Sequence, residues 1–300
     1  MPDPSMPDPS VPDPLVRLDV ASPEHATSLA RLIGEATRAD GQPSFSDQSL
    51  VDLRAGARLG TAIEVDGEIA GVSIMTTVAA PAEAEIVVSP ARRRRGLGGR
   101  LLADVLTRSG GNALIWAHGD HPDARSLAAR AGLHPVRELL QLRLSPVRAP
   151  GGATEVRAFR PGVDDAGWLA LNALAFAGHA EQGALSQADL DARKAEPWFD
   201  PADFLIAAGE DGEMAGFCWL KVEGGIGEFY AVGVSPATQG RGLGRGLVAA
   251  GLERLVARGI RESNLYVEAE NTAAVALYRS VGFVDHSIDI QYASQPSTAT

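Results

Sequence analysis

The sequence predicts an α/β fold built as a tandem duplication, in which each half is a mixed β-sheet flanked by helices. A glycine-rich segment occurs twice, at 85–102 and at 228–247, and Gly96-Leu97-Gly98 of the first copy matches Gly242-Leu243-Gly244 of the second. The order of strand-like and helix-like segments also restarts after about residue 150, which is the spacing of a duplicated domain. An Asp-Gly turn before each glycine-rich segment indicates an antiparallel hairpin, and the helix that follows the glycines indicates a parallel crossover.

The first half begins after a tail at 1–14, whose repeated Pro-Asp-Pro cannot form a helix and offers little to bury, so we expect the tail to be disordered. Ser22-Pro23 opens the first helix as cap and first turn, and Asp66-Gly67 joins two strands. Apolar spacing and these signals predict a first domain at 15–145. Its strands are expected at 15–20, 61–65, 69–78, 85–88, 113–117 and 138–144, and its helices at 24–37, 45–54, 97–107 and 121–130.

Residues 146–154 carry proline and glycine with little to pack, which is typical of a linker. The second domain, 155–300, repeats the order of the first, with Asp211-Gly212 at its hairpin and Gly282 after its last helix. Its strands are expected at 155–159, 204–208, 214–222, around 228–234, at 263–268 and at 283–292, and its helices at 164–176, 187–194, after Gly244 and at 272–280.

Composition limits the class of protein. Three hundred residues with 45% hydrophobic content can bury two cores, and a net charge of −11 argues against affinity for nucleic acid or for an anionic membrane. No apolar run has the length of a membrane span and the first residues lack the pattern of a signal peptide, so we expect a cytoplasmic protein. We also expect a monomer.

Two residue types allow a functional and a structural interpretation. Cys218, the only cysteine, stands in an alternating apolar segment and is more readily a buried core thiol than a nucleophile. His118 and His121 stand in a loop without partners at metal-ligand spacing, so no metal is assigned.

The glycine-rich segment of the second half predicts an anion site. A strand, a tight glycine-rich turn and an apolar helix follow one another, so the amides of the turn lie at a helix N-terminus that carries unpaired N–H groups and partial positive charge. A phosphate-bearing cofactor is the expected ligand.

These residues resemble the GNAT family of N-acetyltransferases. Gln239-x-x-Gly242-x-Gly244 and Arg93-x-x-Gly96-x-Gly98 fit the family's pyrophosphate loop, and Asn271 is followed by Leu277-Tyr278 and Gly282-Phe283 as in its last helix. Several phrases of the second half, such as Glu196-Pro-Trp-Phe-Asp-Pro and Leu265-Tyr-Val-Glu-Ala-Glu-Asn, resemble a tandem-domain branch that forms mycothiol. That resemblance implies transfer of acetyl from acetyl-CoA to the cysteinyl amine of a cysteine–glucosamine–inositol conjugate.

The resemblance also implies which residues bind acetyl-CoA. In the second half they are expected to be Val232, Gly233, Val234, Gln239, Gly240, Arg241, Gly242, Leu243, Gly244, Arg245, Asn271, Thr272, Ala273, Ala274, Val275 and Ala276. In the first half they are expected to be Val87, Val88, Arg93, Arg94, Arg95, Gly96, Leu97 and Gly98.

Acetyl transfer needs a neutral amine and a proton for the leaving thiolate. Glu228 begins the strand that leads to the cofactor loop and is our candidate base; an exposed strand-edge glutamate balancing a nearby arginine is the alternative. Tyr278 stands where the family usually has a tyrosine beside the CoA sulfur and is the candidate acid; a core-packing tyrosine is the alternative.

The acceptor site is carried over from the family alone. The resemblance marks Glu181, Lys221 and Tyr266, together with Glu228, as contacts of the acceptor. It also marks Asp40, although a glutamate would be expected there. Polar groups on a cleft wall suit a ligand rich in hydroxyl groups.

The first half lacks both candidate catalytic groups, because Ala82 aligns with Glu228 and Ala128 aligns with Tyr278. We therefore expect a scaffold or a vestigial cofactor site in the first half, and catalysis in the second. Two other functions stay open: a tandem acetyltransferase for another small amine or a protein N-terminus, and a CoA-binding sensor without turnover.

Overall fold

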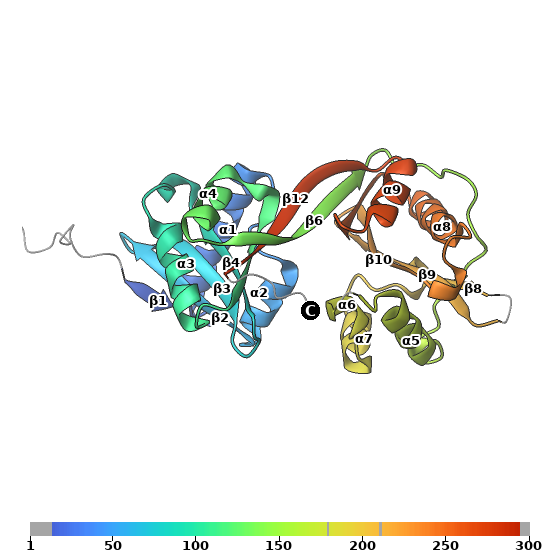
Figure 1. Ribbon diagram of the computed structural model, residues 1–300, viewed down its shortest axis with the longest axis horizontal. Helices are drawn as coiled ribbons and strands as arrows, with labels where there is room; N and C mark the ends of the chain where they lie inside the picture. The colour runs from blue at the N-terminus through green and yellow to red at the C-terminus, as the bar shows by residue number, and fades with distance from the viewer. Residues whose placement is uncertain (1–13, 179, 210–211, 295–300) are drawn as a thin grey trace, which may run out of the picture. The chain divides into compact units, whose positions relative to one another are not determined.

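The computed structural model describes residues 14–178, 180–209 and 212–294, and these form two compact units. Unit 1 holds the residues before and including Glu138 together with those from Ile288 onward, and unit 2 is Leu139–Ser287. The chain passes from one unit to the other within strands β6 (His134–Leu144) and β12 (Val284–Ala293), which are labelled in Figure 1. Apart from Pro14, the predicted tail lies outside the described residues.

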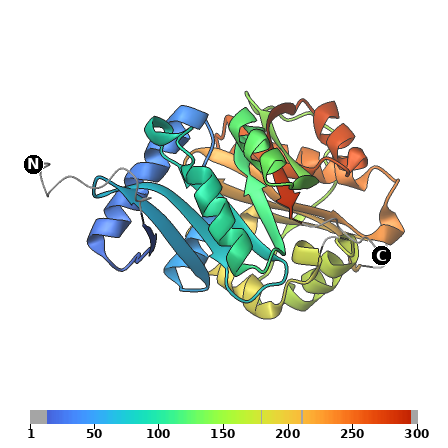
Figure 2. The same cartoon turned by 60° about the vertical axis from the view of Figure 1, so that its left-hand side comes forward.

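Unit 1 is a mixed sheet covered by helices on both faces. Its strands follow the order β1-β2-β3-β4-β5-β12, and only β4 and β5 pair in parallel. Figure 2 shows α3, in green-blue, lying across the blue strands of this sheet. The elements are β1 (Leu15–Arg17), α1 (Pro23–Asp40), α2 (Asp47–Arg54), β2 (Arg58–Val65), β3 (Glu68–Thr76), β4 (Ala82–Val88), α3 (Leu97–Arg108), β5 (Ala113–Ala117) and α4 (Pro122–Arg130).

Two separate apolar layers form because side chains along a strand alternate between its faces. On β2, Ala62 packs with Leu32 of α1 on one face, whereas Ile63 packs with Leu101 of α3 on the other. The sheet is thus buried on both faces.

Unit 2 repeats this architecture. Its strands follow the order β6-β11-β10-β9-β8-β7, and again only the pair β10 and β11 is parallel. Helices α8 and α9 cover one face of the sheet and α5 and α7 the other, as Figure 1 shows. The elements are β7 (Arg157–Ala158), α5 (Asp165–Ala175), α6 (Ala180–Gly183), α7 (Gln187–Lys194), β8 (Phe204–Ala208), β9 (Met214–Glu223), β10 (Ile226–Val234), α8 (Leu243–Ala257), β11 (Glu262–Glu268) and α9 (Thr272–Ser280).

The last strand of each linear half pairs with the sheet of the other compact unit. Residues 139–144 of β6 pair with β11 of unit 2, and Ile290–Ala293 of β12 pair with β5 of unit 1. The two compact units therefore do not coincide with the linear halves expected at 15–145 and 155–300. Strands β6 and β12 both alternate apolar and polar residues, and each lies antiparallel beside a pair of parallel strands. Because both sheets offer the same kind of neighbour, the pattern of either strand fits either sheet equally well.

Most other elements lie where their periodicity places them, and the mixed α/β sheets of the predicted fold are confirmed. The helix α6 was not predicted, because a single turn of helix has no period to detect. The turn at Asp66-Gly67 has both residues at positive φ, as the hairpin signal required. Asp211 of the second predicted turn lies outside the described residues.

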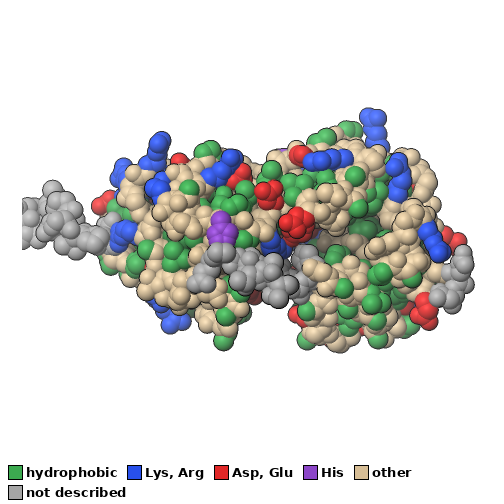
Figure 3. All heavy atoms as spheres, in the orientation of Figure 1, with side chains coloured by type: hydrophobic (Ala, Val, Ile, Leu, Met, Phe, Trp, Pro, Cys, Tyr) green, Lys and Arg blue, Asp and Glu red, His purple; other side chains and the backbone are tan. Residues whose placement is uncertain are grey.

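Surface properties add little beyond composition. On the face shown in Figure 3, Lys and Arg side chains are interspersed with Asp and Glu. None of the helices described is long and apolar enough to cross a membrane.

Candidate active site and a second cofactor cradle

The glycine-rich turn of unit 2 has the geometry of an anion cradle. The helix α8 begins directly after Gly242, whose φ of 84° is left-handed, and Gly240 is left-handed as well. The Gln239 side-chain amide donates to the Val234 carbonyl over 3.3 Å and ties the turn to the end of β10. Backbone amides at the start of α8 are therefore held at the end of the strand, where they can donate hydrogen bonds to phosphate oxygens.

The turn of unit 1 repeats this geometry with different side chains. Gly96, with a φ of 85°, precedes α3 as Gly242 precedes α8, and Arg94 at 63° takes the left-handed place of Gly240. The guanidinium of Arg93 donates to the Val88 carbonyl over 3.2 Å, as Gln239 does to Val234. A left-handed arginine costs about 1–3 kcal/mol and persists where the surroundings fix the backbone. The backbone of the cradle is thus conserved between the two units.

Strand β10 differs from β4 in one respect that matters for chemistry. The pairing of β10 with β9 shifts register between Phe229 and Ala231, which makes a bulge at Tyr230, and the pairing with β11 ends at Phe229. In unit 1 the pairing of β3 with β4 runs without a shift from Gly71 to Met75. A bulge re-aims the side chains beside it and ends pairing. Glu228 lies directly before this bulge.

Glu228 stands in a row of polar residues across three strands. It lies opposite Lys221 of β9 and beside Asn264 of β11. Tyr266, next but one to Asn264 and therefore on the same face, is 42% exposed, and its hydroxyl accepts a hydrogen bond from Gln141 over 2.9 Å. The opposite face of the same strands is apolar and includes Phe229 and Leu265. The structure thus brings together Glu228, Lys221 and Tyr266 on one face of unit 2.

Aromatic side chains that the sequence did not single out border this row. Lys221 Nζ lies 5.6 Å from the centre of the Trp198 ring, whose centre lies 5.2 Å from that of Tyr230. The Tyr230 hydroxyl accepts a hydrogen bond from Arg193 of α7. The side-chain oxygen of Asn264 is buried and has no hydrogen-bond partner among the described residues. Tyr230 could have been predicted from the sequence, because it lies two residues after Glu228 on the same strand. Trp198 lies in a loop, where no periodic pattern indicates a place in the site.

Tyr278 lies in the core of unit 2. It is 8% exposed and packs against the Phe283 ring at 5.9 Å between centres. Burial raises the pKa of Tyr278 above its usual value, with a further contribution from Cys218, so the hydroxyl stays protonated at any physiological pH. Cys218 itself is fully buried and burial raises its pKa, which confirms the interpretation as a core thiol.

Other predicted residues have defined structural roles. Asn271 caps α9, since its side chain accepts a hydrogen bond from the Ala274 amide. Gly233 is needed by packing, because a Cβ there would stand 2.4 Å from the Phe217 ring. Arg245 donates to Ser280 of α9, and Arg241 is exposed. The side chain of Glu181 lies outside the described part of the chain.

Asp40 lies in unit 1, at the end of α1, where both its carboxylate oxygens accept hydrogen bonds from Arg93 at 2.7 and 2.6 Å. This bidentate pair fixes the side chain beside the cradle of its own unit. Its expected contact with the acceptor stays a prediction.

Unit 1 has a cavity of about 640 Å³, within the usual range for a small-molecule site. It extends from the turn at Arg93–Gly98 along Val87 and Val88 of β4 and Ile115 of β5 to His118. The pairing of β4 and β5 ends at Glu85 and Trp116, so the cavity begins where these parallel strands part. The first half thus retains a formed site, although Ala82 and Ala128 replace the two candidate catalytic groups.

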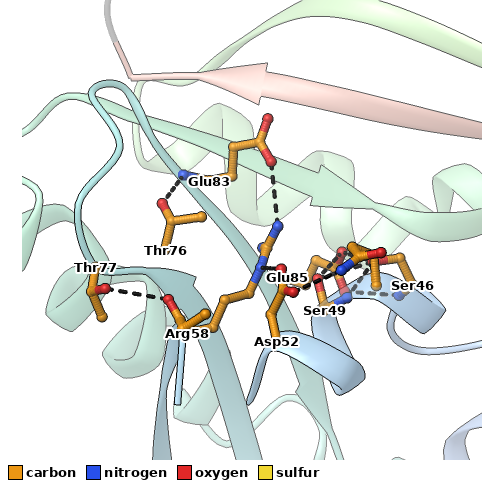
Figure 4. Close-up of polar contacts among 10 residues, drawn as sticks. Ser46, Ser49, Asp52, Arg58, Thr76, Thr77, Glu83 and Glu85 are labelled. Carbon is orange, nitrogen blue, oxygen red and sulfur yellow. Dashed lines mark hydrogen bonds and ion pairs between the residues drawn. The ribbon is translucent and has the colours of Figure 1, made fainter. Parts of the chain in front are cut away.

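A buried charge cluster lies at the point where β4 and β5 part. Glu85 of β4 is 3% exposed and accepts hydrogen bonds from the Ser46 amide and from the hydroxyls of Ser46 and Ser49, at 3.0, 2.8 and 2.9 Å; Figure 4 shows these contacts at the start of α2. His118 Nδ1 hydrogen-bonds Asp289 of β12 over 2.9 Å. Neither Glu85 nor Asp289 was singled out from the sequence.

The charge states of the cluster follow from these contacts. Burial lowers the pKa of His118, but the hydrogen bond to Asp289 and the nearby Glu85 outweigh it and raise the pKa to about 10. Burial raises the pKa of Glu85, but His118 and Ser46 outweigh it and the net pKa is lowered. At neutral pH the cluster is one imidazolium between two carboxylates.

Comparison with known proteins agrees with this architecture. The model of the acetyltransferase (GNAT) family matches residues 27–132 and 171–283. A mycothiol acetyltransferase of Clavibacter michiganensis subsp. michiganensis is 50% identical over 272 residues, covering 87% of this chain and 89% of its own length. One of Streptomyces avermitilis is 46% identical over 293 residues, covering 93% and 94%.

Solved structures agree in fold. A GCN5-related N-acetyltransferase from Sphaerobacter thermophilus has a TM-score of 0.76 at 23% identity, covering 96% of this chain and 98% of its own. A tandem GNAT protein from the clavulanic acid biosynthesis pathway has a TM-score of 0.70 at 18% identity, covering 95% and 99%.

Proposed function

The chain belongs to the acetyltransferase (GNAT) family, and from this premise we propose that its unit 2 acetylates the cysteinyl amine of a cysteine–glucosamine–inositol conjugate with acetyl-CoA, forming mycothiol. The observation that carries the assignment to unit 2 is the position of Glu228. It lies directly before the bulge of β10, on the strand that leads into the cradle at Gly242, and across from Lys221.

In the proposed reaction the amine nitrogen attacks the thioester carbonyl, and the bond between carbon and sulfur then breaks. Glu228 takes a proton from the attacking amine, directly or through a water, because an α-amino group with a pKa near 8 is mostly protonated at neutral pH. The thiolate leaves with a proton from Tyr278, which is neutral at physiological pH because burial raises its pKa, and the second proton of the attacking nitrogen, released as the amide forms, restores the Tyr278 hydroxyl. Replacing Tyr278 by Phe is expected to lower kcat by about 10²-fold while the Kd of acetyl-CoA changes little.

The acceptor is proposed to lie on the polar face of β9, β10 and β11. Lys221, Tyr266 and Asn264 offer hydrogen-bonding groups there, and Trp198 with Tyr230 offers an apolar wall. A sugar and an inositol ring present hydroxyls on their edges and C–H groups on their faces, so such a mixed surface suits both.

The test is to offer acetyl-CoA with three acceptors and to follow release of free CoA: the cysteinyl conjugate, an aminoglycoside, and a peptide with a free N-terminus. We expect release with the conjugate at least 100-fold above the other two, the discrimination that a site built for a polar substrate can reach. Release with another acceptor and not with the conjugate would replace the proposed substrate. Tight CoA binding without release from any acceptor would favour a sensor.

A further inference from the structure

We infer that Gln141 is a positioning residue for acceptor binding: it holds the Tyr266 hydroxyl in the place and orientation in which that hydroxyl donates a hydrogen bond to an oxygen of the sugar–inositol acceptor. The inference rests on the proposed function, which puts the acceptor on the polar face of unit 2. Gln141 belongs to β6, the strand that the linear first half supplies to the sheet of unit 2. A residue outside the domain expected to be catalytic therefore takes part in acceptor recognition.

The polar face of unit 2 continues from β11 onto β6. These two strands are antiparallel, and Gln141 lies directly opposite Tyr266. Residues directly opposite each other in an antiparallel pair share a face of the sheet, so Gln141 lies on the face that carries Tyr266 and Glu228. The neighbours of Gln141 in the chain, Leu140 and Leu142, are buried in the core on the other face. Strand β6 is thus a fourth strand of the proposed acceptor surface.

Tyr266 and Gln141 differ in burial although their side chains are bonded. Tyr266 is 42% exposed, whereas Gln141 is 4% exposed. Gln141 Nε2 donates to the Tyr266 hydroxyl over 2.9 Å, and Gln141 Oε1 accepts a hydrogen bond from the Ser287 hydroxyl of β12 over 3.1 Å. An exposed side chain ordinarily changes rotamer within nanoseconds. Here the end of an exposed ring is tied to a buried amide that a second hydrogen bond fixes.

The direction of the hydrogen bond decides what the hydroxyl can offer. An amide nitrogen only donates, so the phenol oxygen of Tyr266 is the acceptor, and the proton of Tyr266 is directed to a group other than Gln141. The hydrogen bond that Ser287 donates to the amide oxygen agrees with this orientation of Gln141. A hydroxyl that accepts one hydrogen bond is polarised and becomes a stronger donor. The hydroxyl and ring oxygens of a sugar or inositol are acceptors for such a proton.

A purely structural role would not need an amide at position 141. The backbone ladder already joins β6 to β11 from Leu139 to Leu144, so the side-chain bond is not needed for strand pairing. A buried amide loses its hydration, and an apolar side chain of the same shape would avoid that cost. The hydrogen bonds of Gln141 instead fix the position of one hydroxyl at the surface.

The expected kinetic consequence is specific. A side chain that is held in place before the acceptor arrives loses less entropy on binding. Tyr266 contacts the sugar–inositol part of the acceptor in this proposal and not the reacting atoms, so its contribution is the same in the ground state and in the transition state. Loss of such uniform binding raises KM for the acceptor and leaves kcat unchanged.

Steady-state kinetics of the full chain with the cysteinyl conjugate and acetyl-CoA test the inference. Gln141→Met keeps the length of the side chain and removes both hydrogen bonds. We expect KM for the conjugate to rise about 5- to 10-fold, the loss of one hydrogen bond, while kcat and KM for acetyl-CoA stay within about twofold. Gln141→Glu keeps the shape but reverses the bond, because a carboxylate only accepts, and should raise KM for the conjugate at least as much.

Two further variants make the result independent of any one substitution. Ser287→Ala leaves Gln141 in place and removes only the hydrogen bond that fixes its amide, so KM for the conjugate should rise about two- to fourfold. Gln291→Met is the matched control, because Gln291 is a buried glutamine of β12 in unit 1 and is 1% exposed. It should leave KM for the conjugate unchanged.

A double-mutant cycle with Tyr266→Phe separates positioning from a structural defect. Tyr266→Phe should raise KM for the conjugate about tenfold, and adding Gln141→Met should raise it no further, because the group that Gln141 holds is then absent. Additive effects, a fall in kcat, or an unchanged KM in both Gln141→Met and Ser287→Ala would overturn the inference and leave the proposed function standing. Failure of the native chain to acetylate the conjugate would refute the proposed function itself.

Discussion

The two units share the backbone geometry of a glycine-rich turn and differ in the residues that stand where the parallel strands part. In unit 2, Glu228 precedes a bulge and lies among groups that face outward, including the exposed Tyr266. In unit 1 the equivalent strand has no shift in register. Its buried Glu85 accepts hydrogen bonds from Ser46 and Ser49. The same fold therefore places a carboxylate beside a strand bulge in one unit and holds one by buried hydrogen bonds in the other.

This difference shows that position on the strand and solvation decide the chemistry more than residue type does. A carboxylate that accepts several hydrogen bonds beside an imidazolium holds its negative charge too strongly to take a proton. A carboxylate at a bulge, beside the end of strand pairing, can reach a substrate. The glycine-rich turn has the same backbone geometry in both units, whereas the environment of the strand carboxylates differs.

The sharpest test of this comparison is Glu228→Gln. We expect kcat with the cysteinyl conjugate to fall by about 10²- to 10⁴-fold, the usual contribution of a general base, and the remaining rate to rise with pH as the amine deprotonates. The exposed Glu253 of α8 provides the matched control Glu253→Gln, which should keep full activity. Survival of more than a tenth of the rate would mean that unit 1 also turns over, or that another group is the base.

The two cradles can be compared through matched changes, Gly244→Glu and Gly98→Glu. In both positions a Cβ meets only a leucine and a valine at 3.4–3.7 Å, Leu277 and Val234 in one case and Leu127 and Val88 in the other. An acidic residue in the first turn suits the helix but repels phosphate, so the fold should tolerate it.

For Gly244→Glu we expect kcat/KM for acetyl-CoA to fall about 100-fold, or about 2.7 kcal/mol. Gly98→Glu should remove one equivalent of acetyl-CoA binding in calorimetry. Its effect on kcat/KM should be at least tenfold smaller than the effect of Gly244→Glu. The reverse ranking would transfer catalysis to unit 1.

The sequence predicted the duplicated fold and the cradle because both rest on local signals. The glycines at left-handed positions, the cap at Asn271 and the apolar period of α8 are all set by neighbours in the chain. The burial of Cys218 could be read from strand alternation. Where contacts are local in sequence, physical rules for single elements suffice.

The exchange of β6 and β12 and the cluster of unit 1 could not be predicted in this way. His118 and Asp289 are separated by 171 positions and meet only because β12 pairs with β5. A single histidine in a loop gives no signal of that partner, and a glutamate within an apolar strand reads as an exposed edge residue. The hydrogen bonds from Ser46 and Ser49, which come from the start of α2, depend on tertiary packing alone.

The protonated His118 predicts a pH dependence of unit 1 that should weaken in the variant His118→Gln. Its pKa is raised in the folded protein, so its stabilising contribution is fully present below the ordinary pKa near 6.5 and is lost as pH rises through about 10. The melting temperature of unit 1 should therefore fall between pH 8 and pH 10.5 by several degrees more in the native chain than in His118→Gln. Hydrogen exchange of the amides of β5, compared between the native chain and His118→Gln, reports on unit 1; an equal loss of protection in the two chains would contradict the assignment.

The smallest expected effect concerns the backbone of the cradles. Arg94 holds at a φ of 63° the conformation that Gly240 holds at 76°, so unit 1 carries strain that unit 2 avoids. Arg94→Gly should relieve that strain but gain freedom in the unfolded chain, leaving a net stabilisation of at most about 1 kcal/mol. Gly240→Arg is the reciprocal change and should destabilise unit 2 by about the same amount. Chemical denaturation of both variants measures the two changes in the free energy of unfolding. If Arg94→Gly destabilises unit 1 instead, Arg94 contributes through its guanidinium, and the two turns are alike in backbone but not in what stabilises them.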